Sequence, residues 1–155
     1  MDIEHNNDPL KNIMRSMIED LNKISFAASL YSKEFPNESN IIFSTDGQDD
    51  KKLATAYYKF ISVIANSASN METSLSDIPK IMTAADRNIQ FERIALCDQL
   101  LSIYGEFKQS IACFAQSNER LITENKISAA VMLRYLSEFG YKLNYFNEFL
   151  KEHTL

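Results

Sequence analysis

The chain has 155 residues, which is the usual size of one domain, and we expect a single domain over residues 1–155. It contains only 3 Gly and 3 Pro, and its 2 Val stand against 14 Leu and 16 Ile, so sandwiches, small barrels and buried parallel sheets are disfavoured. With 45% hydrophobic residues it can fill a core, while its net charge of −5 argues against partners such as nucleic acid or an anionic membrane.

The first predicted helix covers about residues 9–34. Asp8 suits the N-cap position, and Pro9 suits the first helical position. Apolar residues recur along one face in alternating steps of four and three, which is the pattern of an amphipathic helix. The positions of this stripe are Leu10, Met14, Met17, Leu21, Ile24, Ala28 and Tyr31.

Residues 36–50 form the one predicted loop. Its triplet Ile41, Ile42 and Phe43 is too apolar for an ordinary solvated loop. These side chains either seal the bundle or contact a partner, and a short strand is a further alternative. We expect this loop to be the segment that is most mobile or most involved in partner contact.

The second predicted helix begins near residue 50 and reaches about residue 78. Pro79 lies within its apolar pattern, and proline removes a backbone hydrogen bond from a helix interior. Polar residues that favour helix ends gather between residues 70 and 79. We therefore expect a kink or a break there, in the latter case with a short helix over 79–86. The positions of the stripe are Leu53, Tyr57, Phe60, Ile64, Ser67, Met71, Leu75, Ile78 and Met82.

The third predicted helix, about 88–122, is apolar over roughly 200°, about twice the width that a surface helix needs. One side carries Leu96, Leu100, Ile103, Phe107, Phe114 and Leu121, and the adjoining side carries Ile94, Cys97, Leu101, Tyr104, Ile111 and Ala115. Lys108 interrupts this surface, and we expect its long side chain to reach water, toward Glu138. Because the helix must be covered in two directions, we expect the protein to self-associate or to reside in a complex.

A short turn at 123–125 leads to the fourth predicted helix, about 126–152. Its stripe consists of Met132, Leu136, Phe139, Leu143, Phe146 and Leu150, and it is flanked by Tyr135, Tyr141, Tyr145 and Phe149. Long apolar stripes with steps of three and four, joined by short connections, are typical of antiparallel helical bundles. The sequence therefore predicts an all-α bundle of four to five long helices with heptad-like, coiled-coil packing.

Residues that usually carry catalysis or bind metals are few. His5 and His153 each lie within five residues of a chain end, and we expect both to be solvent-exposed tail residues. Cys97 falls on the apolar arc of the third helix and Cys113 on its polar side, about 24 Å apart, which is too far for a disulfide. We expect one buried and one exposed free thiol, no catalytic residue, no metal site and no cofactor.

The cysteine usage also bears on the compartment, because free thiols fit a reducing environment. The acidic first eight residues do not resemble a secretory signal, and no apolar run approaches the ~20 residues of a membrane helix. We expect a cytoplasmic, acidic protein.

Two glycines lie inside predicted helices, where Gly costs ~1 kcal/mol relative to Ala. Gly105 precedes the turn between the last two helices by about 18 residues, and Gly140 follows it by about 18, so a hairpin brings both to one level. Aromatic residues such as Tyr104 and Phe107 flank them. We expect close packing of the two backbones, and the alternative is a notch for a partner side chain or a small ligand.

Together these features predict a non-enzymatic protein–protein interaction module, such as an adaptor, a chaperone, an inhibitor or a subunit of a helical complex. Its partner would be another protein, a second copy, or both. A membrane-shaping or lipid-binding helical dimer is one alternative, which the acidic charge disfavours, and a binder of a small apolar ligand is another. The expected partner-binding residues are Ile41, Ile42, Phe43, Tyr104, Gly105, Phe107, Tyr135, Gly140, Tyr141, Tyr145 and Phe149.

Overall fold

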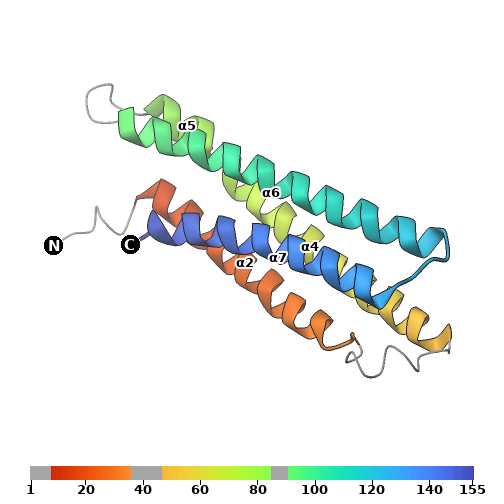
Figure 1. Cartoon of the computed structure of the whole chain (residues 1–155). Coiled ribbons are helices and arrows are strands. Elements are labelled where there is room, and N and C mark those ends of the chain that lie inside the picture. The colour runs from red at the N-terminus through yellow and green to blue at the C-terminus, as the bar shows by residue number, and fades with distance from the viewer. Residues whose placement is uncertain (1–7, 36–46, 85–90) are drawn as a thin grey trace.

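The computed structural model describes residues 8–35, 47–84 and 91–155, and these residues form five helices and no strand. The helices are α2 (Pro9–Ser32), α4 (Gly47–Leu75), α5 (Ile78–Ala84), α6 (Phe91–Thr123) and α7 (Ala129–Glu152). The four long helices lie side by side and alternate in direction (Figure 1). The predicted all-α antiparallel bundle is confirmed, whereas coiled-coil packing stays a prediction.

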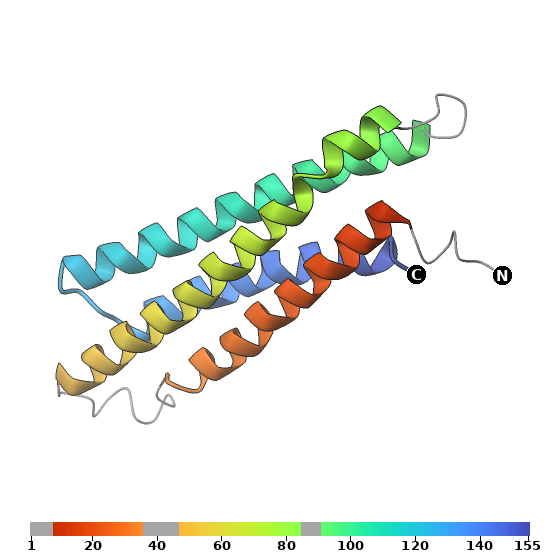
Figure 2. The same cartoon turned by 180° about the vertical axis from the view of Figure 1, so that it is seen from behind.

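The long helices are arranged as a ring in which each one contacts its neighbours in the chain. α2 packs most extensively against α4, α6 packs against both α4 and α7, and α7 returns to pack against α2. Figure 2 shows the same order from behind, with the start of α2 and the end of α7 at the same end of the bundle. This is the up-down-up-down arrangement that short connections favour.

The predicted apolar stripes of α2, α4 and α7 form the core. The stripe of α7 is buried along its whole length, from Met132 to Leu150. Among the stripe positions of α2, α4 and α5, only Ala28 and Met82 are half-buried rather than buried. The centre of the core consists of phenylalanine rings whose neighbouring centroids lie 5.0 to 6.0 Å apart. These rings belong to Phe60, Phe107, Phe114, Phe139 and Phe146.

The wide apolar arc of α6 is covered in two directions within the chain. On one side Phe107 and Phe114 pack against the phenylalanine rings of α7. On the other side Tyr104 is buried, and its hydroxyl donates to the backbone oxygen of Ala68 in α4 at 3.3 Å. Leu101 is the member of the arc that stays exposed, at 41%. The width of the arc therefore does not by itself require a second copy or a partner.

The helix starts follow local capping. The Asp8 carboxylate accepts from the backbone N–H groups of Leu10 and Lys11, as predicted, and it also pairs with Arg93 of α6. α7 begins at Ala129 rather than near residue 126, because the Ser128 hydroxyl accepts from the backbone N–H of Val131 and acts as N-cap. α6 is described from Phe91 on, and its predicted start near residue 88 lies outside the described residues.

The predicted loop over 36–50 is wrong at its end, because α4 already begins at Gly47. Asp50 lies in the first turn of this helix, where the positive end of the helix dipole stabilises a carboxylate. Ile41, Ile42 and Phe43 lie outside the described residues.

The chain breaks between α4 and α5, in the region where the sequence predicts a kink or a break. α4 ends at Leu75 and α5 begins at Ile78. The Ser76 hydroxyl bonds back to the Thr73 carbonyl at 2.6 Å, which closes the end of α4. Pro79 is the second residue of α5, where its missing N–H leaves no hydrogen bond unmade. The break places α5 beside the beginning of α6 (Figure 1).

A tight turn joins α6 to α7. Asn125 has a φ of 56°, the left-handed conformation that Asn tolerates better than most residues. The N–H of Lys126 donates to Leu121 O at 2.8 Å, and the N–H of Asn125 donates to Ile122 O at 3.2 Å. These two bonds form a Schellman motif, which ends α6 and reverses the chain.

Candidate functional site

A groove of about 420 Å³ lies between α6 and α7. We call it the α6–α7 groove, and it is lined by Glu106, Gln109, Ser110, Cys113, Phe114, Ser117, Tyr135, Glu138, Phe139 and Lys142. The buried rings of Phe114 and Phe139, with centroids 5.0 Å apart, form its apolar floor. Polar and charged side chains form its rim, so the groove has the apolar centre and polar border that binding surfaces share.

Two exposed tyrosines lie on α7, the helix that also supplies Tyr135, Glu138, Phe139 and Lys142 to this groove. Tyr141 is 71% exposed and Tyr145 is 59% exposed. They are four residues apart, so they are neighbours on one face of the helix. Tyr145 lines a small hollow together with Glu106 and Lys142, two residues that also line the α6–α7 groove. Tyr145 is therefore continuous with the groove, and Tyr141 lies one turn before it; we call the groove and the two tyrosines together the α6–α7 surface.

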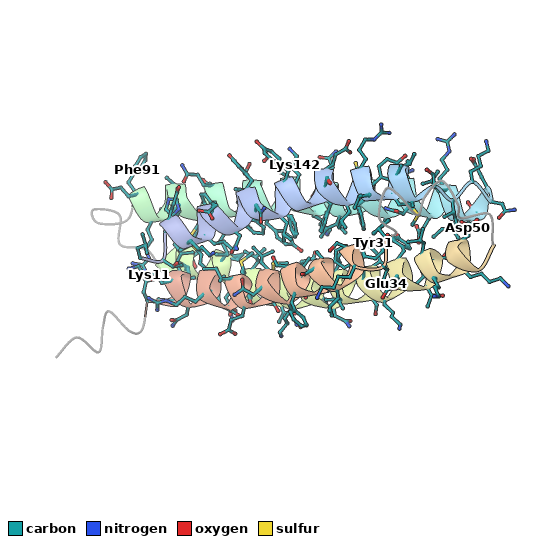
Figure 3. All side chains as sticks on the ribbon, turned by 60° about the horizontal axis from the view of Figure 1, so that its bottom comes forward. Lys11, Tyr31, Glu34, Asp50, Phe91 and Lys142 are labelled. Carbon is teal, nitrogen blue, oxygen red and sulfur yellow. The ribbon has the colours of Figure 1, made fainter. Side chains whose placement is uncertain are left out.

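The charges on the α6–α7 surface are mixed. Glu106 and Glu138 stand against Lys142 in the groove. Lys142 extends from the outer side of α7, away from α2 (Figure 3). Within the described ranges, none of the three charged side chains lies in an ion pair with another residue. Their charges are therefore available to a partner at the rim.

Some of the residues that the sequence predicts for partner binding are buried in the structure, and others are exposed. Tyr104 and Phe107 are buried between helices, so the core accounts for their apolar character. Tyr135 is half-buried in the wall of the α6–α7 groove. Tyr141 and Tyr145 are exposed, as a partner contact requires.

Phe149 packs against the end of its own helix. Its ring centroid lies 4.5 Å from that of His153, and Nδ1 of His153 lies 2.8 Å from the backbone oxygen of Phe149. The prediction that His153 is a solvent-exposed tail residue is therefore wrong, because the side chain is half-buried and follows α7 directly as its C-cap. His5 lies outside the described residues.

The two glycines do not serve close packing. A Cβ atom added to Gly105 or to Gly140 would meet no other heavy atom within 4 Å. The predicted close approach of backbones is therefore wrong, because both positions border open space: Gly105 is exposed and Gly140 is half-buried. The hairpin register is nevertheless near the expected one, since the rings of Phe107 and Phe139 lie 5.7 Å apart.

The two cysteines lie where their positions on the helix predict. Cys97 is buried and Cys113 is exposed, and both thiols are free. Burial raises the pKa of the Cys97 thiol, which keeps it protonated and unreactive. Cys113 lies on the rim of the α6–α7 groove. The sequence predicts that Cys113 is exposed. It does not predict that Cys113 lies beside α7, because a position on the polar side of α6 does not show which helix packs next to it.

Two contacts between polar side chains join α4 to its neighbours. Nζ of Lys108 lies 2.8 Å from Oε1 of Glu72, so the predicted direction toward Glu138 is wrong, because Lys108 faces α4 rather than α7. This hydrogen bond lowers the pKa of Glu72. Between α2 and α4, the carboxylate of Asp20 is buried and accepts from Nδ2 of Asn70 at 3.4 Å. Burial raises the pKa of Asp20.

The described residues hold few other features that point to a function. In residues 8–35, 47–84 and 91–155, no three His, Cys, Asp or Glu side chains come together as a metal site. None of the helices in these ranges is both long enough and apolar enough to cross a membrane. No protein-family model, curated protein or solved structure matches the chain.

Proposed function

We propose that the chain is a non-enzymatic protein–protein interaction module that binds its partner through the α6–α7 surface. The observation that carries this proposal is the pair of exposed tyrosines, Tyr141 and Tyr145, beside an apolar groove. Tyrosine is enriched among the residues that contribute most to protein interfaces, because it offers a large apolar area and a polar end.

The arrangement of this surface suits a helix as the bound element. The groove between α6 and α7 follows the direction of two antiparallel helices, and an amphipathic helix binds grooves of this kind with its apolar face. The aromatic floor and Tyr135 offer contacts for apolar side chains, while Glu106, Glu138 and Lys142 offer contacts for a charged border. The partner is a second copy of the chain or a different helical protein.

The apolar width of α6, from which the sequence predicts association, does not support this proposal. The apolar arc of α6 is covered within the chain, so it no longer supplies a reason for association. Other exposed apolar side chains are distributed over the described helices and include Phe26, Leu30, Tyr58, Phe91, Leu101 and Leu133. Single exposed apolar residues are ordinary in folded proteins. Phe26 and Leu30 are also exposed and one turn apart, and Leu30 lines a groove of its own, but Tyr141 and Tyr145 carry in addition the polar hydroxyl that interfaces favour.

We also propose a cellular compartment and a set of possible roles. Free Cys97 and exposed Cys113 are consistent with a reducing compartment, for which we propose the cytoplasm. Roles as an adaptor, a chaperone, an inhibitor or a subunit of a helical complex all use such a surface.

A comparison of two variants tests the proposal. Tyr141→Ser combined with Tyr145→Ser removes both exposed rings and leaves the core unchanged. Phe26→Ser removes a ring of similar exposure, 68%, from the outer face of α2 and serves as the matched control. Partner capture from native cells and sedimentation over a range of concentrations would be measured for both variants and the wild type, with circular dichroism as the check on folding.

We expect the double variant to weaken binding at least about 30-fold, which corresponds to ~2 kcal/mol, the threshold for a hot spot. The control variant should bind like the wild type. Equal binding by all three proteins would show that the interaction does not use this surface. A wild-type chain that remains monomeric and captures no specific protein would contradict the proposed function itself.

A further inference from the structure

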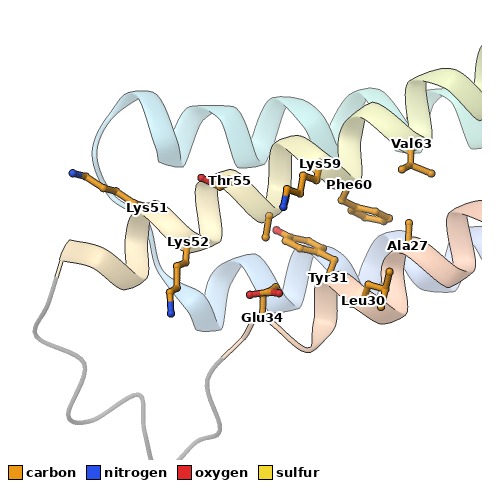
Figure 4. A pocket seen from close by; sticks show the side chains of 11 residues that line it. Ala27, Leu30, Tyr31, Glu34, Lys51, Lys52, Thr55, Lys59, Phe60 and Val63 are labelled. Atoms are coloured by element: carbon orange, nitrogen blue, oxygen red, sulfur yellow. The ribbon is translucent and has the colours of Figure 1, made fainter.

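A second groove lies on the opposite side of the bundle, between the end of α2 and the beginning of α4. It encloses about 460 Å³, which is within the range of small-molecule sites. Ala27 and Leu30 of α2 and Phe60 and Val63 of α4 give it an apolar floor. We call it the α2–α4 groove, and Figure 4 shows its side chains at close range.

The rim of the α2–α4 groove is positively charged. Lys51, Lys52 and Lys59 of α4 line it, against the single carboxylate of Glu34. This excess of positive charge stands out in a chain whose net charge is −5. Within the described part of the chain, none of the three lysines lies in an ion pair. Their charges favour an anion at the mouth of an otherwise apolar groove.

Tyr31, one of the residues that line the same groove, has a buried hydroxyl. Tyr31 is only 3% exposed, and its hydroxyl oxygen has no hydrogen-bond partner among the described residues. Its ring is held by stacking on Phe60, with centroids 5.0 Å apart, and the side chain reaches from α2 toward α4 (Figure 4). A buried polar group without a partner costs free energy, and such a group in a native structure calls for an explanation.

We infer that the α2–α4 groove binds a fatty-acid carboxylate of medium chain length. The hydrocarbon tail lies on Ala27, Leu30, Phe60 and Val63. The carboxylate lies among the lysines and accepts the hydrogen of the Tyr31 hydroxyl, which thereby gains the partner that it lacks. Burial raises the pKa of Tyr31, so this hydroxyl keeps its proton and acts as a donor. Because the Tyr31 hydroxyl is buried, the ligand reaches it only when a side chain of the groove moves, and we assign this movement to the exposed Lys59.

The inference is independent of the proposed function, because it rests on α2 and α4 rather than on the α6–α7 surface. The test uses decanoate at concentrations where it is monomeric, and titration calorimetry on the full chain. Decanol serves as the neutral analogue with the same tail. Vesicles that contain an anionic phospholipid serve as the membrane probe.

Two variants and two matched controls identify the site. Tyr31→Phe removes only the unpartnered hydroxyl, so the fold is retained. Lys51→Gln combined with Lys59→Gln removes two charges of the rim. Tyr145→Phe makes the same change as Tyr31→Phe, and Lys142→Gln removes one lysine charge, both at the α6–α7 surface and away from the α2–α4 groove.

We expect one saturable site for decanoate, with decanol bound at least about tenfold more weakly. Tyr31→Phe and the double lysine variant should each weaken binding about tenfold, as expected for the loss of a hydrogen bond to a charged group, while both controls bind like the wild type. Absence of saturable binding, equal binding of decanol, or equal effects of the control variants would overturn the inference. Binding to anionic vesicles without binding of monomeric decanoate would also overturn it and assign the lysines to a membrane surface.

Discussion

The hydroxyl of Tyr57 in α4 donates to the backbone oxygen of Ala115 in α6, across 3.3 Å. Further along the same pair of helices, Tyr104 of α6 donates in the opposite direction, to Ala68 of α4. These two hydrogen bonds join α4 to α6. α4 thereby covers the second apolar side of α6, for which the sequence alone indicates no neighbouring helix. The bundle thus covers the broad apolar arc of α6 internally except at Leu101, and the most exposed aromatic side chains of α6 and α7 after Phe91 are Tyr141 and Tyr145, both on α7.

Replacement of three buried tyrosines by phenylalanine distinguishes the two hydroxyls that donate a hydrogen bond from the one that has no partner among the described residues. Tyr57→Phe and Tyr104→Phe each lose a hydrogen bond, which is worth about 1 kcal/mol. Tyr31→Phe loses a hydroxyl that has no partner among the described residues, so its free energy of unfolding should stay equal or rise. Urea denaturation measures all three values. A larger loss for Tyr31→Phe than for the other two would show that its hydroxyl is bonded in the folded protein.

Asp20→Asn should make the protein more stable at neutral pH. Burial is the largest cause of the raised pKa of Asp20, and Asn70 and Lys23 only partly offset it. A carboxyl group with a raised pKa holds its proton more tightly in the folded state, so the wild type loses stability as the pH rises above the ordinary value of 3.8. An asparagine at this position carries no charge, and its side-chain oxygen still accepts from Asn70.

The pH dependence provides the control for this prediction. The advantage of Asp20→Asn in melting temperature should be largest at neutral pH and should shrink at about pH 3, where the wild-type carboxyl is protonated in both states. A variant that is less stable than the wild type at neutral pH would show that the charged form of Asp20 is stabilising.

Gly105→Ala and Gly140→Ala should each stabilise the protein. Both glycines lie inside helices, and an added methyl group meets no neighbouring atom within 4 Å. The gain is up to ~1 kcal/mol each, or about 2–4 °C in melting temperature for a chain of this size. Differential scanning calorimetry measures it. A fall in melting temperature would mean that the two backbones approach each other more closely than the structure shows.

Alkylation distinguishes the two thiols. Iodoacetamide should modify Cys113 in the folded protein and leave Cys97 unmodified, because Cys97 is buried and burial raises the pKa of its thiol. Intact-mass spectrometry should show one adduct on the native protein and two after denaturation. Two adducts of similar rate under native conditions would indicate that the end of the bundle around Cys97 opens readily.

Local features of the fold follow from the sequence because they depend on residues close together in the chain. The cap at Asp8, the stripe from Met132 to Leu150 and the break before Pro79 are examples. Each depends on helical periodicity or on backbone chemistry within a few residues.

Features that depend on contacts between distant helices could not be predicted in the same way. A helical wheel places Tyr104 and Tyr141 at angles around their axes, yet it does not show which neighbour covers which angle. For this reason the sequence could not separate buried Tyr104 from exposed Tyr141. It also gave Lys108 the wrong partner, because the choice between Glu72 and Glu138 depends on which helix lies beside that face of α6.

The central claim is that the α6–α7 surface binds a protein, and site-specific photocrosslinking tests it most directly. A photoreactive phenylalanine analogue would replace Tyr141, and in a second protein it would replace Phe26, another exposed ring. After irradiation in native cells, the account predicts a discrete crosslinked adduct, with a second copy or one partner protein, from position 141 and none from position 26. An adduct from position 26 alone, or no adduct from position 141, would contradict it.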